Sequence, residues 1–318
     1  MAMKNVKSVK SLPGETSRFL GKKINYFQLD HKVKNIFEIE GVKVLPSSEA
    51  FEKYPWTRRL FGRKPKEGYF VWVQKQVDFP LTTCVAVATP ETYQDLTNLL
   101  VIEKNIKAKA KVMCQANFSN LHLKHKAQGK MILKDNASLE YTHFHYWGEK
   151  DFVSPDYEFL LGKNSKLVYT YKNLLPPENL HLKTKVYCDE NSSVQLNFAV
   201  NGLNSKIKIE DTIFLEGKNS QGIARLRLAA KDKSEITAVS KIIAKNQGKG
   251  HLDCRGLLIA DDAKINLIPQ VICENKNAQI THEASIGKIS EEELTYLRMR
   301  GLTEKEAIDL IVGGFLKL

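Results

Sequence analysis

Asp135-Asn136-Ala137-Ser138-Leu139 shows the pattern that decides the fold: a polar turn, a small residue, and then an alternating apolar and polar run. Asn and Asp favour left-handed backbone or a side-chain-to-backbone bond, so each such stretch predicts a tight turn that leads into a strand. The same stretch returns at Lys163-Asn164-Ser165-Lys166-Leu167, Glu190-Asn191-Ser192-Ser193-Val194, Asp232-Lys233-Ser234-Glu235-Ile236 and Asp261-Asp262-Ala263-Lys264-Ile265, with a shorter echo at Asn277-Ala278-Gln279-Ile280.

These turns commonly recur about every 27 to 29 residues, with irregularities. Self-similarity on that scale predicts stacked repeats, each of which buries one face against the next. Strand-like runs follow many of the turns, and no helical periodicity separates them. A β-solenoid therefore fits better than a βαβ array, and a β-sandwich is the alternative. The strand-like runs include Thr83–Ala88, Lys107–Met113, Leu139–His145, Leu167–Tyr171, Lys206–Glu210, Ile236–Ile243 and Ile265–Ile272.

Three regions differ in pattern. Residues 1–77 mix polar loops with short apolar runs and a helix start at Ser47, which predicts a mixed α/β region. Residues 78–284 form the strand-rich core. Residues 285–318 become helical, with capping boxes at Ser290-x-x-Glu293 and Thr303-x-x-Glu306. The last helix is apolar on two sides, which is typical of a helix that packs on its own domain and on a partner.

The composition is that of a globular protein: 42% hydrophobic and 26% charged residues in 318. No stretch approaches the roughly 20 apolar residues that a membrane helix needs, and no apolar segment follows the basic start, so we expect a cytoplasmic protein. The five scattered cysteines contain no CxxC pair, which favours reduced and mostly buried thiols.

The net charge of +12 is concentrated at the start of the chain, where residues 1–75 hold 16 Lys and Arg against 7 Asp and Glu. The segment from Arg58 to Lys66 could neutralise phosphates, so a basic nucleic-acid-binding protein is one alternative. No recognised nucleic-acid motif accompanies the charge. A solvated basic face or a contact for an acidic partner is the simpler interpretation.

Residues that could carry chemistry gather near the end of the strand-rich core. They lie in Gly250-His251-Leu252-Asp253-Cys254-Arg255-Gly256, in Ile268-Pro269-Gln270, and in Thr281-His282-Glu283-Ala284-Ser285-Ile286-Gly287. Thiolate, imidazole and carboxylate groups hold iron, and a thiolate of low pKa is the usual sulfur carrier. His251 could favour the thiolate of Cys254. On residue types alone, such a set is more often structural than catalytic.

The stretch from Lys249 to Phe315 resembles the C-terminal core of the SufB and SufD proteins. The matching words are Gly250-His251-x-x-Cys254, the IPQV segment around Pro269, and His282-Glu283-Ala284 followed by Ile286-Gly287-Lys288. Leu297-Arg298-x-Arg300-Gly301-Leu302, Glu306-Ala307 and Ile311-Val312-x-Gly314-Phe315-Leu316 complete the set. Thr281 departs from the pattern, because SufB usually has an acidic residue there.

This resemblance implies a right-handed parallel β-helix core and a non-enzymatic scaffold for assembling a transient iron–sulfur cluster. Cys254 would accept sulfur, and Cys254, His282 and Glu283 would hold metal. Because all three residues occur in one chain, a homodimer, or a pair with a second SufB/SufD-type subunit, could present them at its interface. A sulfur donor protein would supply the sulfur. The terminal helices would dock the ATPase SufC through Leu302, Ala307, Leu310, Ile311 and Phe315. This chain itself would bind no nucleotide.

Two further observations leave alternatives open. A β-solenoid enzyme acting on polysaccharide would line an outer groove with charged residues, which the sequence allows; it contains no phosphate-binding loop, Ser–His–Asp motif or HExxH helix. His143 and His145 share one face of a strand and could form half of a metal site, although packed histidines are commoner. His122 and His125 are three residues apart, and packed histidines are the commoner case there too.

Overall fold

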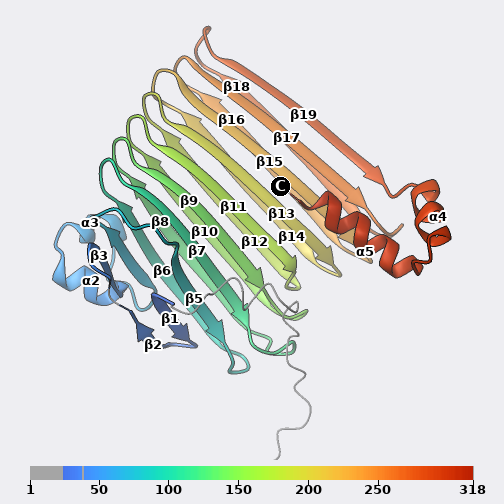
Figure 1. Cartoon of the computed structure of the whole chain (residues 1–318), viewed down its shortest axis with the longest axis horizontal. Coiled ribbons are helices and arrows are strands. Elements are labelled where there is room, and N and C mark those ends of the chain that lie inside the picture. Colours follow the sequence, from blue (N-terminus) through green and yellow to red (C-terminus); the bar gives the residue numbers. More distant parts are fainter. Residues whose placement is uncertain (1–23, 38, 318) are drawn as a thin grey trace, which may run out of the picture.

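The computed structural model describes residues 24–37 and 39–317. It is mainly β, with 59% strand and 11% helix, and it forms a β-solenoid of about 8 turns that ends in two helices (Figure 1). The β-solenoid predicted from the repeated turns is confirmed. Within the described residues, no helix has the length and apolar character needed to span a membrane.

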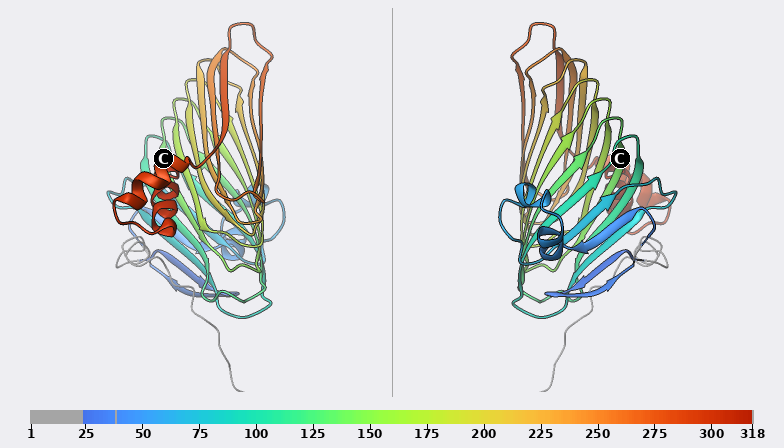
Figure 2. Two further views of the ribbon diagram at one scale, coloured as in Figure 1. Left: turned by 90° about the vertical axis from the view of Figure 1, so that its right-hand side faces the viewer. Right: turned by 90° about the vertical axis from the view of Figure 1, so that its left-hand side faces the viewer.

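Two sheets face each other (Figure 2). From β5 onward, successive strands alternate between these sheets, and each pairs in parallel with the strand two places along the chain. The first sheet contains β1 (Tyr26–Leu29), β2 (Lys32–Ile36), β5 (Leu81–Val87), β7 (Lys107–Ala116), β9 (Ser138–Tyr146), β11 (Lys166–Leu175), β13 (Ser193–Leu203), β15 (Ser220–Lys231), β17 (Gly248–Leu258) and β19 (Gln279–Lys288). The second contains β3 (Val42–Pro46), β4 (Tyr69–Val73), β6 (Tyr93–Ile102), β8 (Lys124–Leu133), β10 (Phe152–Leu161), β12 (Asn179–Cys188), β14 (Lys206–Leu215), β16 (Glu235–Ala244) and β18 (Lys264–Cys273).

The predicted turns lie at two corners of the solenoid: those at Asn136, Asn164 and Asn191 lead into strands of the first sheet, and those at Asp232 and Asp261 lead into strands of the second. Asn136, Asn164 and Asn191 all adopt positive φ, between 55° and 58°, which Asn tolerates better than most residues. Their side chains also connect the turns: Asn136 donates to Asn105 over 3.0 Å, and Asn164 donates to Asn136 over 3.1 Å. The asparagines therefore fix the turn and hold one coil to the next.

Alternation along each strand produces the core. In β14, Ile207, Ile209, Asp211 and Ile213 point between the sheets, while Lys208, Glu210 and Thr212 face outward. Inward side chains from all coils join into one apolar cluster that runs along the solenoid axis. Aromatic rings fill its middle, where the Tyr141 and Tyr169 rings stack with centroids 5.3 Å apart. Stacking of similar coils thus supplies the buried area that a single coil lacks.

The described part of the N-terminal region continues the solenoid. β1 pairs in parallel with β5, and β4 pairs in parallel with β6. The helix predicted at Ser47 is present as α2 (Ser47–Lys53) and is followed by α3 (Thr57–Phe61). Both helices cover outward-facing apolar residues of the second sheet, including Phe70, Leu99 and Val101.

The two predicted C-terminal helices are α4 (Glu291–Met299) and α5 (Glu304–Phe315). Ser290 caps α4, and Thr303 with Glu306 forms a complete capping box on α5. One face of α5 packs on the outer side of the first sheet (Figure 2), where Val312 and Leu316 contact a patch around Ala199, Ala229 and Leu257.

Candidate functional site

Cys254 lies in β17, one strand before the end of the first sheet, and its side chain points into the solenoid with only 2% exposed. Ser240, on β16 in the opposite sheet, contributes a hydrogen bond to the thiol. The Ser240 hydroxyl also lies 2.6 Å from Oδ2 of Asp211, which is 1% exposed on β14. A thiol, a hydroxyl and a carboxyl therefore form a polar cluster inside an otherwise apolar core.

Burial controls the charge state of this cluster. Burial, together with the nearby Asp211 and Asp253, raises the pKa of Cys254 to about 12. Burial also raises the pKa of Asp211 to about 7, against the opposing effect of its Ser240 hydrogen bond. The second carboxyl oxygen of Asp211 has no partner among the described residues. In this conformation Cys254 is a neutral, covered thiol, which corrects the expectation of a low-pKa thiolate.

His282 and Glu283 lie on β19, the last strand of the first sheet, and both are exposed. In the parallel register, His282 lies beside Leu252 and Glu283 lies beside Asp253, while Cys254 is opposite Ala284. Neighbours in register share a sheet face, so His282 is on the Cys254 side and Glu283 is on the outer side. The structure brings the three predicted residues onto adjacent strands but separates Glu283 from the thiol by the sheet.

A network of charged side chains covers the outer face at this point. Glu283 lies 3.3 Å from Nε2 of His251, whose Nδ1 is 2.8 Å from the Thr281 hydroxyl. This corrects the prediction that His251 favours the Cys254 thiolate: the two residues are three apart on one strand and therefore face opposite ways.

Arg227 anchors the same network. Its guanidinium donates to both carboxylate oxygens of Asp253, over 3.1 and 2.6 Å, and both side chains are nearly buried. Burial alone would raise the pKa of Asp253, but Arg227, followed by Arg255, holds it below its usual value. The strand that carries Cys254 is thereby fixed from outside by a buried ion pair.

The five residues predicted to dock a partner occupy different environments. Ala307 is fully buried, and Ile311 and Phe315 are half-buried against the sheet. Leu302 is half-buried, and Leu310 is 56% exposed. Of these five residues, only Leu310 presents its apolar side chain mainly to solvent. The preceding helix, α4, also has two exposed apolar side chains, Tyr296 and Met299.

His143 and His145 both point into the core and are fully buried. Burial lowers the pKa of His143 to about 3 and holds the pKa of His145 well below its usual value, so both imidazoles are neutral. His125, on β8, is buried nearby, with its ring centroid 6.2 Å from that of His145.

Sequence reasoning missed Asp211, Ser240 and Arg227 as neighbours of Cys254. A signal for Asp211 was present, because the alternation Ile207-x-Ile209-x-Asp211-x-Ile213 puts a carboxyl at an inward position. Ser240 carried a similar signal between Ala238 and Ile242.

Comparison with known proteins identifies the family. Residues 85–315 match the family model described as SUF system FeS cluster assembly, SufBD core domain. An iron–sulfur cluster assembly SufBD family protein of Methanothermobacter thermautotrophicus (strain Winter) is 30% identical over 303 residues, covering 88% of this chain and 74% of that protein.

Similar proteins occur in other groups. One from Archaeoglobus fulgidus is 27% identical over 315 residues, covering 92% of this chain and 84% of its own length. One from Synechocystis is 26% identical over 265 residues, covering 79% of this chain and 55% of its own length. Both have the same family name. The chain belongs to the SufBD family of iron–sulfur cluster assembly proteins.

Proposed function

We propose that this chain is a non-enzymatic scaffold subunit on which iron–sulfur clusters are built in the cytoplasm, with Cys254 as sulfur acceptor and His282 and Glu283 as iron-binding partners. The observation that carries the proposal is the position of these residues: adjacent strands at the open end of a SufBD core. Family membership favours this role over a polysaccharide-acting solenoid or a nucleic-acid-binding protein.

The burial of Cys254 implies that the end coil must move during the work. A thiol that is 2% exposed, with a pKa near 12, cannot attack or accept sulfur from a donor protein. Displacing β18 and β19 would expose it to solvent and relieve the burial that raises its pKa. We infer that a SufC-type ATPase, which would supply the energy that this chain does not, drives that opening.

A second subunit fits the same end of the molecule. In the described part of the chain, β18 and β19 are the last strands of their sheets, and each has one edge that pairs with no other strand. Such edges are templates for pairing with another chain. Val271, Ile272 and Ile286 are exposed there. We propose that a second copy, or another SufB/SufD-type subunit, covers this end and places its own His282 and Glu283 equivalents beside Cys254.

Reconstitution tests the sulfur-acceptor role. The full chain is co-expressed with a SufC-type ATPase under anaerobic conditions, and iron and acid-labile sulfide are measured in the purified complex. Cys254→Ala should lose the cluster. Cys188→Ala is the matched control, because Cys188 is also a fully buried interior thiol but lies in β12, away from the end coil. Equal iron and sulfide in Cys254→Ala and wild type would refute the assignment.

Co-purification tests the docking surface. Leu310→Asp combined with Met299→Asp should weaken association with the ATPase while leaving the solenoid folded, because both side chains face solvent. Tyr93→Asp, which changes a similarly exposed apolar residue near the other end of the solenoid, should bind normally. Unchanged co-purification of the helix variant would exclude this surface.

A further inference from the structure

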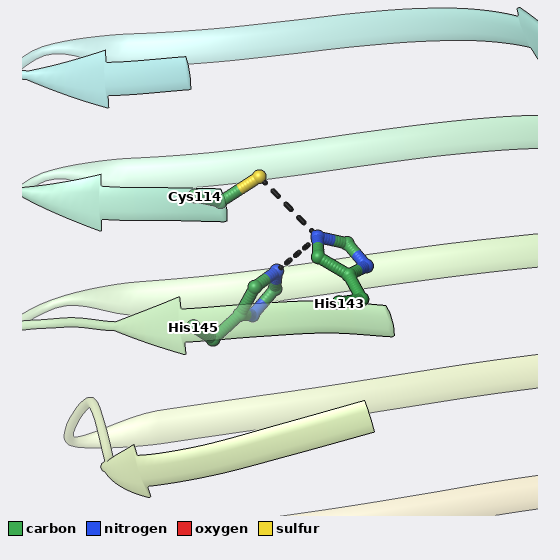
Figure 3. A group of neighbouring side chains, drawn as sticks. All are labelled: Cys114, His143 and His145. Atoms are coloured by element: carbon green, nitrogen blue, oxygen red, sulfur yellow. Dashed lines mark hydrogen bonds between the residues drawn. The ribbon is translucent and has the colours of Figure 1, made fainter. Parts of the chain in front are cut away.

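A second group of metal-binding side chains lies inside the solenoid, away from the Cys254 coil. Cys114 on β7 and His145 on β9 are opposite each other in register, and His143 is two residues before His145. All three side chains are buried and point into the space between the sheets (Figure 3). β9 is four strands from β17 in the sheet, which places this group roughly 19 Å from the Cys254 strand at about 4.8 Å per strand.

The three ligand atoms converge as they would around one metal ion. Nε2 of His143 is 3.4 Å from Sγ of Cys114 and 3.0 Å from Nε2 of His145, and all three atoms lie within 4.8 Å of one another. Around tetrahedral zinc, with bonds of about 2.3 Å to sulfur and 2.0 Å to nitrogen, ligand atoms lie about 3.3 to 3.6 Å apart. The observed contacts need only small adjustments to reach those separations.

The outer contacts of the two imidazoles differ. Nδ1 of His143 is buried without a hydrogen-bond partner among the described residues, and it would carry the ring proton when Nε2 binds an ion. Nδ1 of His145, in contrast, lies 2.9 Å from the Tyr171 hydroxyl, which is the kind of outer contact that orients a metal-bound imidazole through its other nitrogen.

His125 supplies an independent indication of a ligand. Its Nδ1 lies 2.9 Å from the side-chain oxygen of Gln94, whose amide nitrogen donates to the Asp30 carbonyl and so fixes the amide orientation. Nδ1 of His125 therefore carries the proton, and Nε2 has a free lone pair. That Nε2 is buried without a hydrogen-bond partner among the described residues. A nitrogen lone pair that accepts no hydrogen bond is costly in an apolar core unless a ligand contacts it.

We propose that Cys114, His143 and His145 bind one divalent transition-metal ion of the zinc or ferrous type through Sγ and the two Nε2 atoms. One thiolate with two imidazoles is a ligand set that these borderline metals accept. A water molecule would complete the coordination and could donate to the free lone pair of His125 Nε2. Binding releases the Cys114 proton to solvent, and no redox change is involved. The ion locks β7 to β9 in the middle of the solenoid and is separate from any cluster built at Cys254.

Metal analysis of the full chain tests the proposal. Because the site is closed, the protein is unfolded and refolded anaerobically with excess Zn²⁺, Fe²⁺ or Co²⁺ in separate samples, then desalted, and the bound metal is counted. We expect one ion per chain. The Co²⁺ form should show the thiolate-to-cobalt absorption of a sulfur-ligated tetrahedral ion, and X-ray absorption of the Zn²⁺ form should show sulfur and nitrogen neighbours.

Variants separate this site from other thiols. Cys114→Ser should lose the cobalt–thiolate band, whereas Cys188→Ser and Cys254→Ala should keep it together with the bound ion. His125→Gln should keep both the ion and the thiolate band, because His125 is not one of the three protein ligands. Absence of stoichiometric metal from refolded wild type, or retention of the thiolate band in Cys114→Ser, would overturn the proposal. Should Cys114→Ser fail to fold, the wild-type spectra decide.

Discussion

Asp211 is a carboxyl in the core beside Cys254, and its removal makes a sharp test of the site's electrostatics. Asp211→Asn keeps the size of the side chain and an oxygen that can accept from Ser240. What changes is the charge. Burial raises the pKa of Asp211 from 3.8 to about 7, so between these values the folded chain holds a proton that the unfolded chain releases. Wild-type stability therefore falls as the pH rises through this window.

The size of the effect follows from the shift. At about 1.4 kcal/mol per pKa unit, a rise from 3.8 to about 7 corresponds to about 4 kcal/mol that wild type loses between pH 4 and pH 7 and that the variant keeps. The new amide also carries N–H groups without a clear partner, which costs about 1–3 kcal/mol at every pH. We therefore expect Asp211→Asn to be no more stable than wild type at pH 4.5 but more stable than wild type at pH 8.

Urea unfolding followed by circular dichroism at pH 4.5, 6 and 8 measures this difference. With a slope near 3 kcal/mol per molar urea, the variant's midpoint should move up relative to wild type by about 1 M across the range. Asp156→Asn is the control, since Asp156 faces outward and is exposed. An offset between Asp211→Asn and wild type that does not depend on pH would refute the reasoning. Removing the Asp211 charge should also lower the pKa of Cys254, because Asp211 is one of the groups that raise it.

Three other substitutions test the frame around the site. Asn164→Ala should lower stability by about 1–2 kcal/mol because of its positive φ, whereas Asn164→Gly should cost less in backbone strain; equal thermal midpoints for the two would contradict this. Arg227→Ala should cost about 3 kcal/mol in urea unfolding by leaving Asp253 buried with a weaker partner, while Lys245→Ala, in an exposed pair, should change stability by less than about 1 kcal/mol. Val312→Asp should release α5 to limited proteolysis, whereas Leu310→Asp, on its exposed side, should not.

The turns and alternating runs made the solenoid predictable. Asn136, Asn164 and Asn191 have a direct physical reason to stand where they do, since each must adopt left-handed backbone. The two capping boxes were equally local signals, and both predicted helices are present. Such features need no knowledge of the rest of the fold, because the side chain and the backbone it stabilises lie within three residues.

Contacts between coils were harder to predict, for a reason of geometry. Cys114 and His143 are 29 residues apart, and the length of a coil varies by several residues along the chain. A strand alternates faces at every residue, so an error of one residue in register moves a side chain from the core to the surface. The sequence could therefore suggest that His143 and His145 share a face but could not find Cys114 as their neighbour.

The same alternation has a consequence for the proposed assembly chemistry. Cys254 points inward and Glu283 points outward on adjacent strands, so within one closed chain the backbone of the sheet lies between the thiol and this carboxylate. A cluster that uses both needs either a displaced β19 or a carboxylate from a second subunit that enters the opened end. His282 shares the Cys254 face and needs only the opening. In the proposed scaffold, the thiol stays neutral and covered until the end coil moves, and we expect this cover to protect it from oxidation between rounds of assembly.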